Sequence, residues 1–170
     1  ESGVYCEIQP CTWVNATSLD AFIPNAIILS GGPASVTLAE APQADPAIFT
    51  LGVPVLGICY GQQTMCAELG GVVEGDDYRE FGRAFLEVVD HCTLFDGLWQ
   101  PGDREQVWMS HGDQVESLPK GFKSIASTDN TSIAAMADES RKFYGLQFHP
   151  EVTHTTQGTK ILERFLHQIV

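Results

Sequence analysis

The chain contains one cysteine whose neighbours favour nucleophilic chemistry. The sequence Gly57-Ile58-Cys59-Tyr60-Gly61 follows a short apolar run and precedes a stretch with helical spacing. This G-x-C-x-G pattern is the cysteine analogue of the strand-to-helix elbow that exposes a serine nucleophile in hydrolases. Glycines leave room for the close packing and unusual backbone of such a turn, and the positive end of the helix favours a thiolate. We therefore interpret Cys59 as a nucleophile; the alternative is a buried structural cysteine.

A thiolate nucleophile needs a proton donor for its leaving group, and that donor must be oriented. His149, Pro150 and Glu151 follow an apolar run late in the chain. The stiff proline link lets both side chains project from one edge of a sheet, so that Glu151 can bond one ring nitrogen of His149 and leave the other for the thiol. Alone this tripeptide is a weak signal, because histidine before proline also ends ordinary strands. Together with the elbow, it predicts a triad of Cys59, His149 and Glu151.

Attack on a carbonyl group creates an anionic oxygen, which backbone amides can hold. The N–H of Tyr60, at the start of the expected helix, is one candidate donor. The turn Gly31-Gly32-Pro33, which follows an apolar run, supplies the other candidate because glycine lets the backbone come close. A plain tight turn is the alternative reading of this tripeptide.

Strands and helices in alternation must position these residues. Apolar or alternating runs predict strands at 3–8, 26–30, 54–58, 84–90, 107–110, 122–128, 132–137 and 142–148. Helical spacing predicts a helix at 60–70 and an amphipathic helix at 158–170. This pattern favours an α/β fold with an open, mostly parallel sheet flanked by helices and with additional antiparallel strands. Sites in such folds lie at the carboxyl ends of the strands.

Composition limits the classes of partner. The 170 residues include 44% hydrophobic side chains, enough for one domain. Nine Lys plus Arg against 22 Asp plus Glu give a formal charge of -13, which argues against nucleic acid and anionic membranes as partners. No apolar run approaches the roughly 20 residues that span a bilayer, and no signal-peptide pattern is evident.

The five cysteines are odd in number and never spaced as CxxC. Neither a disulfide framework nor a metal site is expected from this spacing. Reduced thiols indicate a reducing compartment, and we expect a cytoplasmic protein.

The GGP turn, the GxCxGxQ elbow and the late HPE, in this order, resemble the class I glutamine amidotransferase family over essentially all 170 residues. The resemblance implies a flavodoxin-like fold and hydrolysis of glutamine to glutamate and ammonia through a cysteine thioester. The segments SGGPASV, PVLGICYGQQ, VWMSHGD and YGLQFHPEVTHT are most similar to the branch that supplies ammonia for the amination of XMP to GMP in purine biosynthesis. They are less similar to the anthranilate, carbamoyl phosphate and CTP synthase branches.

The resemblance also implies residue roles. Cys59 would attack the carboxamide of glutamine, with His149 moving protons and Glu151 orienting it. The amides of Gly32 and Tyr60 would form the oxyanion hole. A further set would bind glutamine: Gln63 in the pocket, Ser110 and Asp113 on the α-amino group, and, less directly, His111. For the SHGD segment, a polar turn is the structural alternative.

Ammonia implies a partner, because ammonia released into water at neutral pH would mostly become unreactive ammonium. The resemblance implies a synthetase (ATP pyrophosphatase) domain or subunit that binds ATP, Mg²⁺ and XMP, and a homodimer formed through that part. No cofactor is expected in residues 1–170 themselves. Arg79 and Glu80 are candidates for the surface that faces this partner, with a solvated charged loop as the alternative. Members of the family normally have a further strand and helix before the position of Glu1, so we expect an amidotransferase domain without them.

Other functions remain open at this point. One is a related Cys–His enzyme, either a γ-glutamyl hydrolase or the glutaminase subunit of another amidotransferase. The other is a catalytically silent module that regulates a synthetase.

Overall fold

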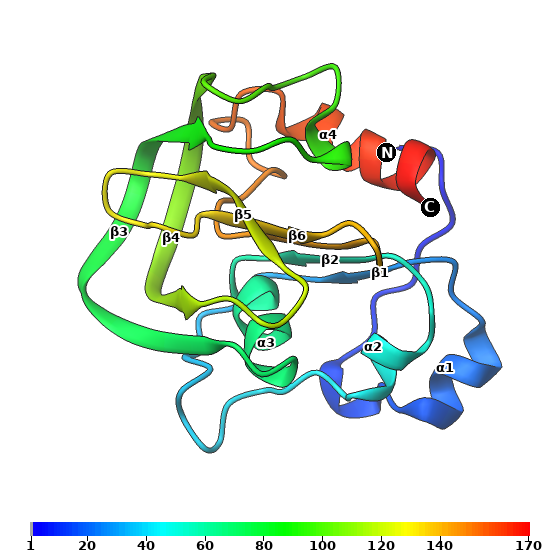
Figure 1. Ribbon diagram of the computed structural model, residues 1–170. Coiled ribbons are helices and arrows are strands. Elements are labelled where there is room, and N and C mark those ends of the chain that lie inside the picture. The colour runs from blue at the N-terminus through cyan, green and yellow to red at the C-terminus, as the bar shows by residue number, and fades with distance from the viewer. Residues whose placement is uncertain (1) are drawn as a thin grey trace.

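A mixed sheet organises the chain. The computed structural model describes the backbone of residues 2–170 and the side chains of residues 2–75 and 79–170. Within that part, seven strands form one sheet in the order β1-β2-β7-β6-β5-β3-β4 (Figure 1). The strands are β1 (Ile27–Leu29), β2 (Val55–Ile58), β3 (Val72–Val88), β4 (Arg104–Ser117), β5 (Lys123–Ser127), β6 (Ala135–Asp138) and β7 (Phe143–Leu146).

The sheet has a parallel part and an antiparallel part. β1, β2 and β7 pair in parallel, and the other described pairings are antiparallel. The predicted open α/β sheet with additional antiparallel strands is confirmed, although the parallel part is smaller than expected. One reason is that β4 to β7 follow one another through short connections, which cannot make the crossover that parallel pairing requires. Among β3 to β7, only β3 and β4 are joined by a longer segment, 89–103.

Helices cover both faces of the sheet (Figure 1). On one face lie α4 (Gly158–Arg164), its continuation η3 (Phe165–Ile169) and the short η2 (Thr93–Phe95). On the other face lie α1 (Ala16–Phe22), α2 (Ala47–Thr50) and α3 (Tyr60–Glu68), and η1 (Cys11–Trp13) precedes α1. None of the helices in residues 2–170 combines the length and hydrophobicity needed to cross a membrane.

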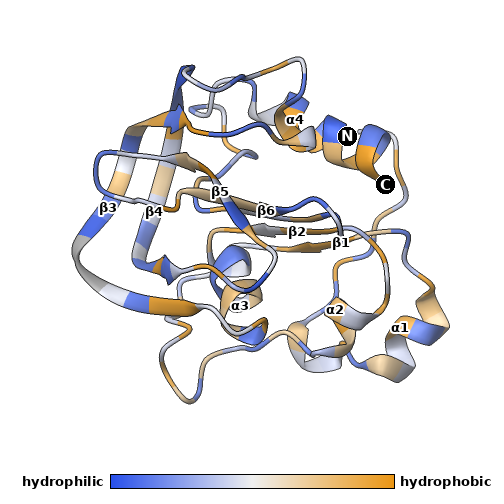
Figure 2. Cartoon of the chain, in the orientation of Figure 1, coloured by the Kyte–Doolittle hydropathy of each residue, from blue (hydrophilic) through white to orange (hydrophobic). Residues whose placement is uncertain are grey.

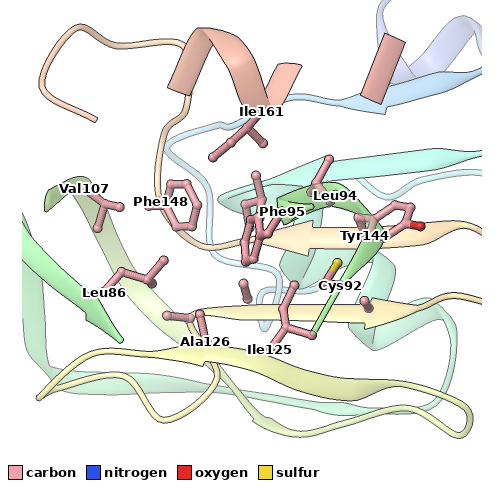
Figure 3. Close-up of a cluster of buried hydrophobic side chains, with 14 of the residues drawn as sticks. Leu86, Cys92, Leu94, Phe95, Val107, Ile125, Ala126, Tyr144, Phe148 and Ile161 are labelled. Atoms are coloured by element: carbon pink, nitrogen blue, oxygen red, sulfur yellow. The ribbon is translucent and has the colours of Figure 1, made fainter. Parts of the chain in front are cut away.

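Each face of the sheet has its own hydrophobic cluster. The larger cluster packs α4 and η2 against the strands, and Figure 3 shows Phe148 of the sheet side near Ile161 of α4. The second cluster packs α1, α2 and α3 against the opposite face. Successive side chains of β2 point to opposite faces of the sheet: Val55 belongs to the second cluster and Leu56 to the first. In Figure 2, β1 and β2 are mostly hydrophobic, whereas β3 and β4 alternate along their length.

Helix α3 lies directly on the strands because glycines face it. A Cβ atom on Gly61 would lie 2.0 Å from the carbonyl oxygen of Leu29 on β1, and one on Gly57 would lie 2.5 Å from the carbonyl oxygen of Gly61. Real Cβ atoms do not approach backbone so closely, so only glycine permits this contact. The contact brings the start of α3 to the carboxyl ends of β1 and β2.

Most predicted elements are present, and one is not. The helix predicted at 60–70 and the amphipathic helix at 158–170 are confirmed as α3 and as α4 with η3. The strand predicted at 3–8 is wrong, because these residues run exposed along the surface without a strand partner. A β-rich sequence forms a strand only when a neighbouring strand accepts its hydrogen bonds. The runs at 84–90 and 107–110 are parts of the much longer β3 and β4.

We predict that Gly61→Ala destabilises the chain. In an exposed helix this change would add about 1 kcal/mol of stability, but here the methyl group meets backbone that cannot move aside, and overpacking of this kind costs about 1–3 kcal/mol. Urea denaturation of the two proteins measures the difference. Glu68→Ala, at the exposed end of the same helix, is the matched control. Equal midpoints for Gly61→Ala and the parent chain would show that the glycine contact is not tight.

Candidate active site

Cys59 occupies a strained elbow between β2 and α3. Its φ of 52° and ψ of -108° are unusual for a residue with a side chain. Its N–H donates to the carbonyl oxygen of Leu146 on β7 at 2.7 Å, and its carbonyl oxygen accepts from the N–H of Gln62 at 3.0 Å. The residue is 3% exposed. The sequence-based expectation of an unusual backbone at this cysteine therefore matches the structure.

His149 reaches the same edge of the sheet from the neighbouring strand. β2 and β7 are parallel partners, so the segments that follow them start side by side. The N–H of His149 donates to the carbonyl oxygen of Trp108 at 3.0 Å. Its Nδ1 lies 2.7 Å from Oε1 of Glu151. Its Nε2 is buried and has no hydrogen-bond partner among the described residues, which leaves that nitrogen for the thiol or a substrate.

The electrostatics of this group favour a protonated imidazole. Two neighbours raise the pKa of His149 to about 10: the Cys59 sulfur has the largest effect, and the hydrogen bond to Glu151 has the next largest. Burial acts in the opposite direction and lowers this pKa. Burial alone would raise the pKa of Glu151, but the hydrogen bond and charge of His149 lower it overall. Because the folded-state pKa of His149 lies above 6.5, the protonated ring stabilises the fold below pH 6.5, and this contribution is lost as the pH rises toward 10.

The predicted oxyanion donors lie beside this group. A Cβ atom on Gly31 would lie 3.0 Å from Cε1 of His149 and 3.5 Å from Cβ of Cys59, and one on Gly32 would lie 3.8 Å from the ring of Tyr60. The turn after β1 therefore packs against the elbow. The N–H of Tyr60 stands at the first position of α3, where it has no partner within the helix. The turn after β1 and the start of α3 thus lie next to each other, and the amides of Gly32 and Tyr60 remain the predicted oxyanion hole.

Of the predicted glutamine-binding residues, Ser110 contacts the thiol, and Gln63 and Asp113 are hydrogen-bonded to each other. The carbonyl oxygen of Ser110 on β4 accepts from the Cys59 thiol at 3.4 Å. The carboxylate of Asp113 accepts from the hydroxyl of Ser35. Gln63 donates both amide hydrogens, to the carbonyl oxygen of Asp113 at 2.8 Å and to Oε1 of Gln147 at 3.1 Å. Gln63 can therefore offer a ligand only its acceptor oxygen.

The SHGD segment is part of a strand and not a turn. β4 runs through Ser110, His111 and Asp113 without a break. His111 is 5% exposed, and both of its ring nitrogens have internal partners. The structure therefore places His111 behind the other candidates, where it does not face an incoming ligand.

Glu80 is buried, contrary to the expectation from the sequence. It was expected on a partner-facing surface, yet it is 9% exposed and accepts hydrogen bonds from His111, Thr128 and Thr131. The alternation of β3 turns it inward, while its neighbour Arg79 is exposed. No local sequence signal reveals these contacts, since the partners are far apart along the chain.

The outer face of β3 and β4 carries arginines and aromatic rings. Arg79, Phe81, Arg83 and Phe85 border a shallow hollow there. Phe81 is 63% exposed, and Arg104 stacks over Phe85. Among the residues whose side chains are described, no group of three or more His, Cys, Asp or Glu could hold a metal ion.

We predict that Glu151→Gln lowers the pKa of His149. Glutamine keeps the size of the side chain but removes the charge and the strong acceptor that stabilise the imidazolium. An NMR titration of the His149 ring in both proteins measures the shift, and Glu163→Gln on the exposed side of α4 is the control. An unchanged titration would contradict the assigned role of Glu151.

Curated relatives match almost the whole length of this chain. A chain from Sinorhizobium fredii called GMP synthase (glutamine-hydrolyzing) is 56% identical over 169 residues, which cover 99% of this chain and 32% of the relative. One of the same name from Phenylobacterium zucineum is 58% identical, again over 99% of this chain and 32% of the relative. The chain thus spans about a third of the length of these relatives.

Solved structures show the same fold. A candidate GMP synthase component from Thermoplasma acidophilum has a TM-score of 0.72 at 26% identity, with 90% of this chain and 75% of that chain covered. A glutamine amidotransferase from Thermotoga maritima has a TM-score of 0.63 at 26% identity, with 85% and 61% covered. The family model for class-I glutamine amidotransferases matches residues 1–169. The chain belongs to the class I glutamine amidotransferase family.

Proposed function

We propose that this chain hydrolyses glutamine to glutamate and ammonia, and that the ammonia serves the amination of XMP to GMP. The observation that carries the proposal is the strained Cys59 at the start of α3, with the His149–Glu151 pair beside it. The glutamine-hydrolyzing GMP synthases that match at 56% and 58% identity support the choice of acceptor.

In the first half of the reaction, the sulfur of Cys59 attacks the carboxamide carbon of glutamine. The carbonyl π electrons move onto oxygen, and the amides of Gly32 and Tyr60 stabilise that anion. When the tetrahedral intermediate collapses, the C–N bond breaks and His149 gives its proton to the leaving nitrogen. Ammonia departs and a γ-glutamyl thioester remains on Cys59.

In the second half, water attacks the thioester carbon while neutral His149 takes one proton from it. The C–S bond breaks, glutamate leaves, and the thiolate and the imidazolium are restored. Glu151 holds the ring in the orientation that both steps need, with Nδ1 toward the carboxylate and Nε2 toward the reacting atoms.

Substrate binding follows from the charges near the thiol. The carboxylate of Asp113 suits the α-ammonium group of glutamine, and the acceptor oxygen of Gln63 and the backbone near Ser110 offer further contacts. These roles need no metal or other cofactor in this domain. Direct attack by sulfur and proton transfer by histidine account for every step.

The ammonia passes to a synthetase domain or subunit that binds ATP, Mg²⁺ and XMP. Two observations support such a partner: the chain spans about 32% of its relatives, and the outer face of β3 and β4 exposes aromatic rings beside arginines. Within this proposal, the protein works in the cytoplasm and forms a homodimer through the synthetase part.

We predict that the glutamine analogue diazo-oxo-norleucine forms one covalent adduct, on Cys59, and that glutamine suppresses it. Mass spectrometry of the digested chain locates the adduct. Cys66 on the same helix is an internal control, because burial raises the pKa of its thiol to about 11. Cys59→Ala should remove the adduct.

Other outcomes separate the alternative functions. Equal labelling of several cysteines, without protection by glutamine, would overturn the proposal and favour a silent regulatory module. Protection by γ-glutamyl peptides but not by glutamine would favour a γ-glutamyl hydrolase. An adduct that glutamine suppresses, in a chain whose ammonia does not reach XMP when the synthetase is present, would favour another amidotransferase.

A further inference from the structure

A buried polar cluster lies behind the candidate glutamine site. Glu80 of β3 is 9% exposed, His111 of β4 is 5% exposed and Thr131, after β5, is 1% exposed. Oε2 of Glu80 lies 3.2 Å from Nε2 of His111 and accepts from the hydroxyl of Thr131 at 2.8 Å. Oε1 accepts from the hydroxyl of Thr128 at 3.2 Å. The proposed reaction uses none of Glu80, Thr128 and Thr131.

The hydrogen bonds of His111 place a hydrogen on Nδ1. Its Nδ1 lies 2.9 Å from the carbonyl oxygen of Asp113, which can only accept, so Nδ1 carries a hydrogen. Its Nε2 faces the Glu80 carboxylate, which also accepts. Burial alone would raise the pKa of Glu80, but the hydrogen bonds from His111, Thr131 and Thr128 outweigh burial and lower it, so Glu80 is charged. His111 therefore donates from Nδ1 to the backbone of Asp113, while its Nε2 lies against Glu80 and Thr131.

This pair holds one atom of the glutamine site in place. The carbonyl oxygen of Asp113 accepts from His111 and also from Nε2 of Gln63 at 2.8 Å. Gln63 is on α3, close after Cys59, and its amide also donates to Gln147, close before His149. Asp113 is thus tied on one side to the triad elements and on the other side to Glu80.

The sheet restrains this point less than a regular ladder would. The register between β3 and β4 shifts between Gly75 and Glu80, where Gly75 lies opposite Asp113 and Glu80 lies opposite His111. Regular ladder hydrogen bonds are interrupted at such a shift. The side-chain hydrogen bonds to the Asp113 carbonyl oxygen therefore add to the restraint that the ladder gives there.

We propose that Glu80 is a positioning residue for glutamine: through His111 it fixes the backbone of Asp113, so that the Asp113 carboxylate is set to receive the α-ammonium group. Thr128 and Thr131 hold Glu80 in turn. This inference rests on the proposed glutaminase function. It assigns to His111 an indirect role and to Glu80 a role that sequence patterns do not indicate.

The test compares glutamine binding with thiol reactivity in the 170-residue chain. Glu80→Met removes the carboxylate and keeps a side chain of similar length. We expect the glutamine concentration that half-protects Cys59 from diazo-oxo-norleucine to rise about ten-fold, which is the size of effect found for residues that orient metal ligands. The rate at which iodoacetamide alkylates Cys59 should change less than about two-fold. Glu80→Gln should retain most of the binding, because its amide can donate to a neutral His111 ring. Glu87→Met, exposed on the same strand, is the matched control.

The outcomes separate this proposal from the function on which it rests. If the parent chain shows no protection by glutamine, the proposed function fails and this inference fails with it. If the parent chain is protected and Glu80→Met is protected equally well, only the role of Glu80 is overturned. A parallel loss of iodoacetamide reactivity would also overturn it, since general disruption would then explain the effect. If Glu80→Met does not fold, Thr131→Val decides: it removes one donor to Glu80, and unchanged protection would contradict the proposal.

Discussion

The backbone of Cys59 is the constraint on which the rest of the site depends. A residue with a side chain at φ 52° and ψ -108° costs of order 1–3 kcal/mol. Burial in the surrounding fold offsets this cost, because each fully buried side chain of the flanking strands, such as Leu56 and Leu146, contributes about 1.5–3 kcal/mol of stability. The glycine contact between α3 and β1 then fixes the direction in which the elbow points.

The two parts of the sheet contribute different components. The parallel strands β2 and β7 end side by side and bring the nucleophile next to His149, while the antiparallel β4 brings Ser110 and Asp113 from the opposite direction. Buried polar side chains join these parts, since Gln63 bridges Asp113 and Gln147. A buried polar group costs stability unless it is paired, and the threonines around Glu80 supply donors to its carboxylate. In the same network, Nε2 of Gln147 is buried and has no partner among the described residues.

Much of this arrangement could be predicted from the sequence, for identifiable reasons. The elbow at Cys59 and the pair His149–Glu151 are encoded in a few adjacent residues, so local patterns reveal them. The expectation for residues 3–8 failed because strand propensity does not show whether a partner strand exists. Glu80 was expected at the surface because the direction of its side chain depends on its place in the long strand β3. The register shift near Gly75 sets that place, and the hydropathy pattern of the sequence does not reveal it. The parallel share of the sheet was overestimated because buried strands of both kinds look alike in sequence.

The central claim is that Cys59 forms a covalent bond with the acyl group of glutamine. The most direct measurement is to mix the chain with glutamine, quench it in acid within the first turnover, and determine the mass of the peptide that contains Cys59. The account predicts an added γ-glutamyl group on that peptide, absent from the other cysteine peptides and lost on treatment with hydroxylamine. Ammonia release with no acyl group on Cys59, under conditions in which a thioester would survive, would contradict it.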